Sequence, residues 1–358
     1  MLRESTFNPI SLVANPCCNR VLFGVVPALV KAMRRRDFIK VIAGSAVAWP
    51  LASRAQQPMP VIGWLFGISA ETGQPQLAAF RKALADTGYV EGHNVKIEYR
   101  WADGKYDQLP VMAADLVAQR VALIVAGAGE PVAFAAKAAT STIPIVMVVG
   151  SDPVKEGLVV SLNRPGGNAT GATVYAYNME SKRLGLLHEA VPAAKTIAVL
   201  VDPANPAVEL QTRDVQEAAL RLGVKVVIVD ARAGGEFESL FTAMAEQKTG
   251  ALLVAADPYF YSQRRQLITL AAHHRLPAIY EWRQFAVEGG LMSYGTVLTD
   301  AYSQAGSYAG RILNGERPGD LPVVQPTNFP FVINLKTAKA LGLEFPPTLS
   351  ARADEVIE

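Results

Sequence analysis

The stretch Arg164-Pro165-Gly166-Gly167-Asn168-Ala169-Thr170-Gly171-Ala172-Thr173-Val174-Tyr175 divides the sequence into two halves of similar organisation. Residues 165–168 favour a turn, because proline fixes φ and glycine or asparagine tolerates positive φ. Residues 172–177 include threonine, valine and tyrosine, which are typical of a strand. The stretch therefore predicts a crossover between two lobes, in which a bend leads into an extended segment.

Short apolar runs recur in the same order in the two halves. They cover residues 61–66, 95–99, 121–126 and 145–149, and then 196–201, 224–229, 251–255 and 278–280. Segments with helical spacing separate these runs, a pattern that predicts parallel strands covered by helices on both faces. We therefore expect an α/β fold with two Rossmann-like lobes. Ligands of open α/β sheets bind beyond the carboxyl ends of the strands, so functional residues are expected in the cleft between the lobes.

Two more connections between the lobes are predicted further along the chain. Residues 289–295 read as a strand that enters a glycine bend, and residues 321–333 contain three prolines, which disfavour a central strand. A helix is expected at 302–313 and another at 335–341. The predicted lobes are residues 56–172 plus 296–323 and residues 173–295 plus 324–358.

The segment before residue 56 has the features of an export signal. Arg35-Arg36-Asp37-Phe38-Ile39-Lys40 precedes an apolar run at 41–51, and Ser53-Arg54-Ala55 provides small residues for a signal peptidase. The segment resembles a twin-arginine signal, although Arg34 replaces the more usual serine or threonine. The apolar run is too short for a membrane span, which needs about twenty residues. We expect cleavage after Ala55, a periplasmic mature protein and a possible true start at Met33.

Composition limits the class of protein. The chain has 358 residues, 50% of them hydrophobic and 18% charged, enough for one large or two ordinary domains. The segment before residue 56 holds eight of the 34 basic and two of the 32 acidic residues, so the remainder has a formal net charge of −4. A negative net charge gives no excess of basic residues to attract the phosphates of a nucleic acid. The two cysteines, Cys17 and Cys18, also lie in this segment, so we expect a mature chain without disulfides or cysteine ligands.

A glycine-containing loop follows the third apolar run. Gly127-Ala128-Gly129-Glu130 precedes Pro131, which is well placed in the first turn of a helix. Glycines allow a ligand to approach backbone N–H groups, and a helix start favours an anionic group. A tight turn with only a structural role is the alternative. A dinucleotide site is disfavoured, because Val132 stands where the fingerprint requires a third glycine.

Polar residues follow other predicted strands. Asp152, Asn205 and Asp257 could each cap the next helix or contact a ligand. Asp257 is followed by aromatic residues at 259–261, which could stack on a flat ligand while its carboxylate neutralises an amine. The alternative is that these aromatic side chains pack between the lobes or under the helix.

Several motifs together resemble a known family. They are Asp152-Pro153-Val154, Gly157-Leu158-Val159, residues 164–171, Lys182-Arg183-Leu184, Gly290-Leu291, Ser293-Tyr294-Gly295 and Asn334-Leu335-Lys336-Thr337-Ala338. The sequence from about residue 60 to 350 is similar to the periplasmic substrate-binding proteins of ABC transporters, in the TrpX-like group. The resemblance implies a type I periplasmic binding protein, with two lobes joined by three crossovers. It also implies that the lobes close on a small molecule, often an aromatic amino acid, and deliver it to a membrane permease.

Enzymatic chemistry has little support in the sequence. There are four histidines, and no Gly-x-Ser-x-Gly, Walker or His-Glu-x-x-His motif. His273 and His274 would point about 100° apart on a helix, which makes them poor joint metal ligands. We expect no enzyme activity, cofactor or metal, and a monomer. An exported cofactor-binding α/β enzyme and a sugar or nucleoside sensor of the same fold are the alternatives.

The expected ligand is a small zwitterionic or carboxylated molecule with a flat or aromatic part, bound without chemical change. A branched-chain amino acid, a sugar and a nucleoside remain alternatives. The residues expected to contact the ligand are Ser69, Gly127, Ala128, Gly129, Glu130, Asp152, Tyr175, Asn205, Asp257, Tyr259, Trp282 and Tyr294.

Overall fold

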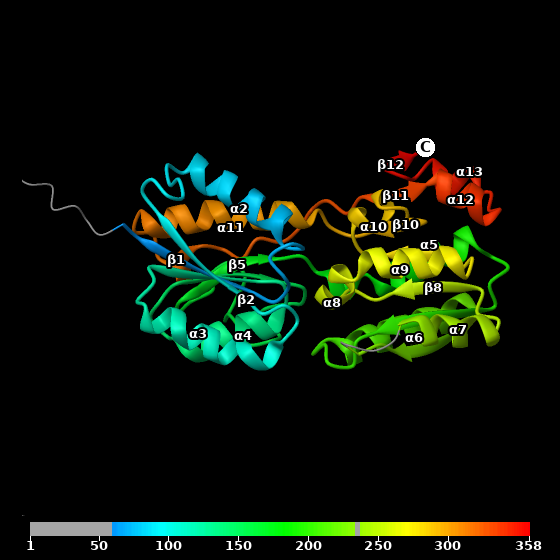
Figure 1. Cartoon of the computed structure of the whole chain (residues 1–358), viewed down its shortest axis with the longest axis horizontal. Helices are drawn as coiled ribbons and strands as arrows, with labels where there is room; N and C mark the ends of the chain where they lie inside the picture. Colours follow the sequence, from blue (N-terminus) through cyan, green and yellow to red (C-terminus); the bar gives the residue numbers. More distant parts are fainter. Residues whose placement is uncertain (1–58, 233–236) are drawn as a thin grey trace, which may run out of the picture. The chain divides into compact units, whose positions relative to one another are not determined.

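The computed structural model describes residues 59–232 and 237–358, which form two sheets flanked by helices (Figure 1). The predicted export signal, Met33 and both cysteines lie outside these residues. Within the described part, no helix is long and apolar enough to cross a membrane.

The first sheet has five parallel strands in the order β2-β1-β3-β4-β5. The strands are β1 (Val61–Phe66), β2 (Lys96–Trp101), β3 (Leu123–Gly127), β4 (Ile145–Val149) and β5 (Ala169–Thr173). Helices α2 (Gln74–Asp86) and α11 (Leu298–Leu313) cover one face, and α3 (Leu109–Ala118) and α4 (Glu130–Ala139) cover the other (Figure 1). The order places the carboxyl ends of β1, β3 and β4 side by side.

The second sheet has seven strands in the order β12-β11-β10-β9-β8-β6-β7. All neighbouring strands are parallel except β10 and β11. The strands are β6 (Thr196–Val201), β7 (Lys225–Asp230), β8 (Ala251–Val254), β9 (Ala278–Tyr280), β10 (Met292–Tyr294), β11 (Phe331–Asn334) and β12 (Glu355–Ile357). The helices around it are α5 (Glu180–Ala190), α6 (Val208–Leu222), α7 (Phe237–Glu246), α8 (Pro258–Ser262), α9 (Arg264–His273), α10 (Arg283–Val287), α12 (Leu335–Leu341) and α13 (Pro347–Ser350).

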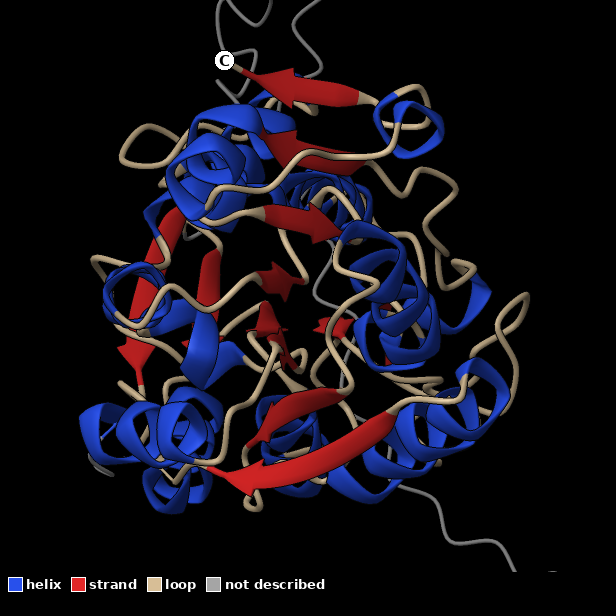
Figure 2. Ribbon diagram, turned by 90° about the vertical axis from the view of Figure 1, so that its right-hand side faces the viewer, coloured by secondary structure: helices blue, strands red, loops and turns tan. Residues whose placement is uncertain are grey.

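Successive side chains along a strand point to opposite faces of the sheet, and in the second sheet the side chains on both faces are apolar. Helices therefore cover both faces. Ile197 and Val199 of β6 belong to the core under α5 and α6, whereas Leu200 belongs to the core under α7 and α9. Both faces of the strand are therefore buried, as expected for a parallel sheet. Figure 2 shows the strands in red with blue helices on either side. The α/β fold with two lobes of mostly parallel strands is confirmed.

The first crossover differs from the expectation in its strand. The strand β5 covers Ala169–Thr173 and not 172–177, because the backbone turns at Tyr175, where φ is 44°, into a short 3₁₀ helix at Ala176–Asn178. Gly171 allows the earlier start: a Cβ there would lie 1.9 Å from the carbonyl oxygen of Met147 in β4. The β-branched residues that suggested the later strand therefore lie partly beyond its end.

Two further chain segments pass between the sheets. One runs from β10 through Gly295 into α11, which begins at Leu298 and not at residue 302 as expected. The other passes Val324, whose N–H donates to the Gly171 carbonyl while its own carbonyl accepts from Thr173 N–H, and continues into β11. Three crossovers thus connect the sheets within the described residues. The exact lobe boundaries stay a prediction.

Helix α11 returns to the first sheet and packs closely on α2. A Cβ added at Gly306 would lie 2.3 Å from the Phe80 carbonyl oxygen, and one at Gly310 would lie 1.8 Å from Thr87 Oγ1. These two glycines, four residues apart, therefore bring the helices together.

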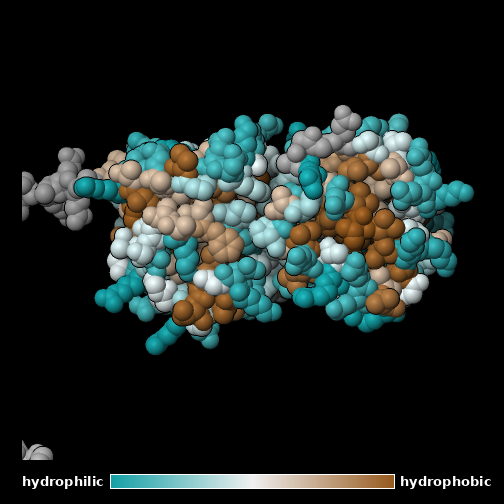
Figure 3. All heavy atoms as spheres, turned by 90° about the horizontal axis from the view of Figure 1, so that it is seen from below, coloured by the Kyte–Doolittle hydropathy of each residue, from teal (hydrophilic) through white to brown (hydrophobic). Residues whose placement is uncertain are grey.

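The surface of the protein is mixed in polarity. Leu220 of α6 and Val111 of α3 are among the exposed apolar side chains. Figure 3 shows brown apolar areas beside teal hydrophilic ones.

Candidate ligand-binding site

A cavity lies where the carboxyl ends of the strands of the two sheets meet. It is lined from the first sheet and its helices by Phe66, Ile68, Gln76, Ala128, Gly129, Val148, Val149, Gly150, Leu298 and Tyr302, and from the first crossover and the second sheet by Val174, Ala176, Tyr177, Pro258, Tyr261 and Trp282. The position is the one that the strand pattern predicts for a ligand.

Aromatic rings form much of the cavity wall. Tyr261 packs edge-on against Trp282 with ring centroids 5.0 Å apart, and Phe66 lies 5.5 Å from Tyr302. Rings in these arrangements attract one another and offer both flat faces and polar edges to a bound molecule. The wall therefore suits a flat, largely apolar ligand.

Glycines at the strand ends make room for these rings. A Cβ at Gly127 would lie 2.6 Å from the Phe66 ring and 2.9 Å from Tyr302, and a Cβ at Gly150 would lie 2.6 Å from the Tyr177 ring. Gly127 therefore serves the packing of aromatic side chains and does not itself line the cavity. Gly129 does line it, with φ of 109°, at the start of α4.

The start of α4 is one of the few polar features of the wall. No side chain caps this ten-residue helix. The Ala128 N–H donates to the Tyr302 hydroxyl oxygen over 3.0 Å, so Tyr302 keeps its own proton for another acceptor. Backbone N–H groups at a helix start attract negative charge, which makes this end of the cavity the better place for a carboxylate.

Glu130 lies behind the wall. It is 2% exposed, and its Oε1 accepts from the N–H groups of Gly150 and Ser151, both at 2.7 Å. Its Oε2 accepts from the Tyr177 hydroxyl at 2.9 Å. The carboxylate thus holds the loop after β4 and the Tyr177 ring in place.

Asp152, another expected contact, accepts a hydrogen bond from Val154 N–H at 3.0 Å and caps its own turn.

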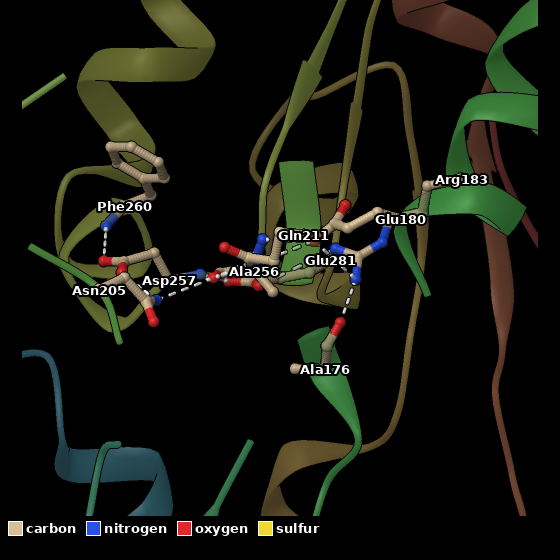
Figure 4. Close-up of polar contacts among 9 residues, drawn as sticks. All are labelled: Ala176, Glu180, Arg183, Asn205, Gln211, Ala256, Asp257, Phe260 and Glu281. Atoms are coloured by element: carbon tan, nitrogen blue, oxygen red, sulfur yellow. Dashed lines mark hydrogen bonds and ion pairs between the residues drawn. The ribbon is translucent and has the colours of Figure 1, made fainter. Parts of the chain in front are cut away.

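Asp257 is the N-cap of α8 and is 3% exposed. Its carboxylate accepts from Phe260 N–H at 3.4 Å and Asn205 Nδ2 at 2.6 Å (Figure 4). It also accepts from Tyr259 N–H at 2.6 Å. Burial raises the pKa of Asp257 to about 7, with a further increase from the Asp202 charge, and the three hydrogen bonds act against the rise. The carboxylate does not line the cavity, but the next residue, Pro258, does.

A buried polar cluster lies behind Asp257 (Figure 4). Arg183 Nη2 is 3.4 Å from Glu180 Oε1, and Arg183 Nη1 is 4.0 Å from Glu281 Oε2. The cluster is connected to both sides of the cavity: Arg183 donates to the Ala176 carbonyl, and Glu281 Oε1 accepts from Asp257 N–H at 3.4 Å. Burial raises the pKa of both glutamates, and Arg183 opposes the rise. The cluster therefore fixes two segments of the wall from behind.

The other expected contacts lie elsewhere. Ser69 and Tyr259 line a second cavity, beside Tyr106. Tyr175 and Tyr294 lie at the crossovers: the Tyr175 hydroxyl accepts from Gln325 Nε2 at 2.9 Å, and Tyr294 stacks on Phe329 with centroids 6.5 Å apart. The expected residues that line the main cavity are thus Ala128, Gly129 and Trp282.

Several wall residues stand outside the set of contacts expected from the sequence. Phe66 is the last residue of a predicted strand, and Tyr261 belongs to the aromatic run after Asp257, so both carried a usable signal. Gln76, Tyr177 and Tyr302 carried none, because the sequence does not show which side of a helix or crossover faces the cleft.

The paired histidines lie on a different part of the second sheet. One ligand atom from each of Glu238, His273 and His274 falls within 4.8 Å of the others, although the two histidine rings are nearly perpendicular. Glu238 and His273 are exposed. The group is separate from the cavity.

Comparisons with known proteins agree with this arrangement. Residues 68–357 match the family model described as ABC transporter substrate binding protein. A tyrosine-binding protein of Clostridioides difficile is 30% identical over 282 residues, which are 78% of this chain and 81% of that protein.

Two solved structures are informative as a pair. An ABC domain of Streptococcus pneumoniae in complex with L-Trp has a TM-score of 0.75 at 26% identity, and the ligand-free, open form of an adhesive substrate-binding protein of Clostridium difficile has 0.60 at 27%. Both comparisons cover 83% of this chain and 99% of the other. At similar identity and coverage, the structure is closer to the ligand-bound protein than to the open one. The chain belongs to the family of ABC transporter substrate-binding proteins, with the type I periplasmic binding protein fold.

Proposed function

We propose that this substrate-binding protein captures a free aromatic amino acid in the cavity between its two sheets and delivers it to the permease of an ABC importer. The observation that carries the proposal is the cavity itself, with its aromatic walls, an uncapped helix start and a buried carboxylate immediately behind. Tyrosine and tryptophan appear in the names of two similar proteins, which supports the same class of ligand.

The groups around the cavity fit the parts of such a ligand. The ring would pack among Phe66, Tyr261 and Trp282. The ligand carboxylate would lie at the start of α4, where N–H groups offer donors. The ammonium would lie toward Asp257, since the main influences on its pKa are burial, a second carboxylate and hydrogen-bond donors, with no basic side chain among them. A buried carboxylate without a cationic partner favours a cationic ligand group.

The export signal belongs to the same proposal. A binding protein that serves an importer meets its ligand outside the cytoplasmic membrane, and Arg35-Arg36 with the boundary at Ala55 provides the route. We therefore place the mature protein in the periplasm, beginning at Gln56.

Native mass spectrometry of protein isolated from the periplasm tests both parts together. The full chain with its own leader should give a mature species that begins at Gln56, with an added mass equal to tyrosine or tryptophan in the fraction that keeps its ligand. Denaturing the same sample serves as the control, because it should remove the added mass. A species that carries a sugar mass, or a cytoplasmic species that retains Arg35-Arg36, would contradict the proposal.

A further inference from the structure

The side chain of Gln76 lies in the first turn of α2, on the wall of the main cavity. The residue is 2% exposed, although its neighbour Gln74 in the same turn is exposed. The amide oxygen of Gln76 has no hydrogen-bond partner among the described residues. A buried amide oxygen without a donor is unfavourable, and native proteins rarely leave one.

The other end of this amide is already engaged. Gln76 hydrogen-bonds the side chain of Tyr261, an interaction that lowers the pKa of the tyrosine against the larger effect of burial. The amide oxygen is the atom without a partner, so the NH₂ group is the end that faces Tyr261. Tyr261 belongs to α8 of the second sheet and Gln76 to a helix of the first, so the hydrogen bond bridges the cavity.

The described side chains around the Gln76 amide oxygen provide no hydrogen-bond donor to it. Phe66, Ile68, Val148 and Leu298 line the same cavity with apolar side chains. The Tyr177 hydroxyl donates to Glu130 Oε2. The Tyr302 hydroxyl still has its own proton to donate, but it makes no hydrogen bond to the Gln76 oxygen. A molecule bound in the cavity would supply the missing donor.

We propose that Gln76 Oε1 accepts a hydrogen bond from an N–H or O–H on the ring of the bound amino acid, so that the cavity selects an indole or phenol over a phenyl ring. The inference rests on the proposed function and makes it more specific. A site that holds a buried acceptor discriminates strongly against a ligand that lacks the donor, because the acceptor is then left unpaired.

Calorimetric titration with matched ligand pairs tests the inference. One pair is L-tyrosine and L-phenylalanine, and the other is L-tryptophan and 1-methyl-L-tryptophan, in which the indole N–H is replaced. For whichever pair binds, we expect the donor-bearing member to bind the wild-type protein roughly tenfold more tightly or better. In Gln76→Leu the preference should fall to about twofold or less, mainly through weaker binding of the donor-bearing member. Gln74→Leu, an exposed change in the same helical turn, should keep the wild-type preference.

Each outcome has one meaning. Equal affinity of both members for the wild-type protein would overturn the role of Gln76 while leaving the proposed function intact, and this comparison needs no variant. A preference that survives in Gln76→Leu, and in Gln76→Met where the leucine variant folds poorly, would also overturn it. Absence of binding by all four compounds would refute the proposed function, and this inference with it.

Discussion

Replacing Arg183 by methionine should lower the free energy of unfolding by about 3–5 kcal/mol, the loss typical of a buried charge pair that loses one partner. Arg183 is fully buried, with Glu180 and Glu281 on either side. Methionine fills similar space but leaves two buried carboxyl groups without a cation. It also removes the donor to the Ala176 carbonyl, which holds part of the cavity wall.

The loss of unfolding free energy in Arg183→Met should be smaller at low pH than at high pH. Burial already raises the pKa of Glu180 and Glu281 in the folded protein, and removal of the arginine raises both further. A carboxyl with a raised folded pKa binds more protons in the native than in the unfolded state, so stability falls as pH rises from the unfolded pKa through the folded one. The variant should therefore be less impaired at pH 5 than at pH 8.

Urea denaturation of wild type and Arg183→Met at these two pH values measures the effect. Arg213→Met serves as the control, because Arg213 lies on the exposed side of α6 and should cost little at either pH. A loss in Arg183→Met that equals the control, or one that is larger at pH 5, would show that the arginine does not neutralise these carboxylates.

The second large effect is expected from Asp257→Asn, which should weaken binding of the amino acid by roughly tenfold, because the carboxylate lies behind the wall at Pro258 and acts on the ammonium through its charge and not through direct contact. Asparagine can still accept hydrogen bonds from Tyr259 and Phe260 N–H as a helix cap. The ligand-free variant should therefore keep its helix cap and fold, but it loses the hydrogen bond from Asn205 Nδ2, because an amide NH₂ group replaces the carboxylate oxygen that accepts it.

The wild-type affinity should also depend on the protonation of Asp257. Its pKa is raised to about 7, chiefly by burial, and an ammonium prefers the ionised carboxylate. Below pH 7 the ligand must displace a proton, so affinity should fall toward tenfold per pH unit and level off above pH 7. Titrations between pH 5.5 and 8.5 check this. A wild-type affinity that is flat across the range, or an Asp257→Asn variant with the wild-type pH profile, would be incompatible with an ammonium at this carboxylate.

The sequence predicts the fold well where physical signals are local and repeated. The apolar runs at 61–66, 145–149 and 196–201 coincide with β1, β4 and β6, since each is continuous and bounded by turn residues. The strand β5 was misplaced because its start depends on the close approach of Gly171 to Met147, a contact between residues distant in sequence. Propensity alone favoured the β-branched residues that follow.

The candidate site was less predictable for a related reason. A polar residue at the end of a strand can face the cleft or turn back to bond its own loop, and sequence does not distinguish the two. Glu130 and Asp257 turn back, and they act on the cavity from behind its wall. Gln76 carried no signal because the apolar residues Leu77, Phe80 and Leu84 mark the buried face of α2, and a glutamine beside that face reads as solvent-exposed.

The cavity between the sheets is expected to hold an aromatic amino acid. The most direct measurement is calorimetric titration of protein that has been unfolded, dialysed free of ligand and refolded, at pH 8. L-tyrosine or L-tryptophan should bind with one molecule per chain and a negative heat-capacity change, as expected when an apolar ring is buried. Saturable binding of a neutral sugar, with no heat from either aromatic amino acid, would contradict the account.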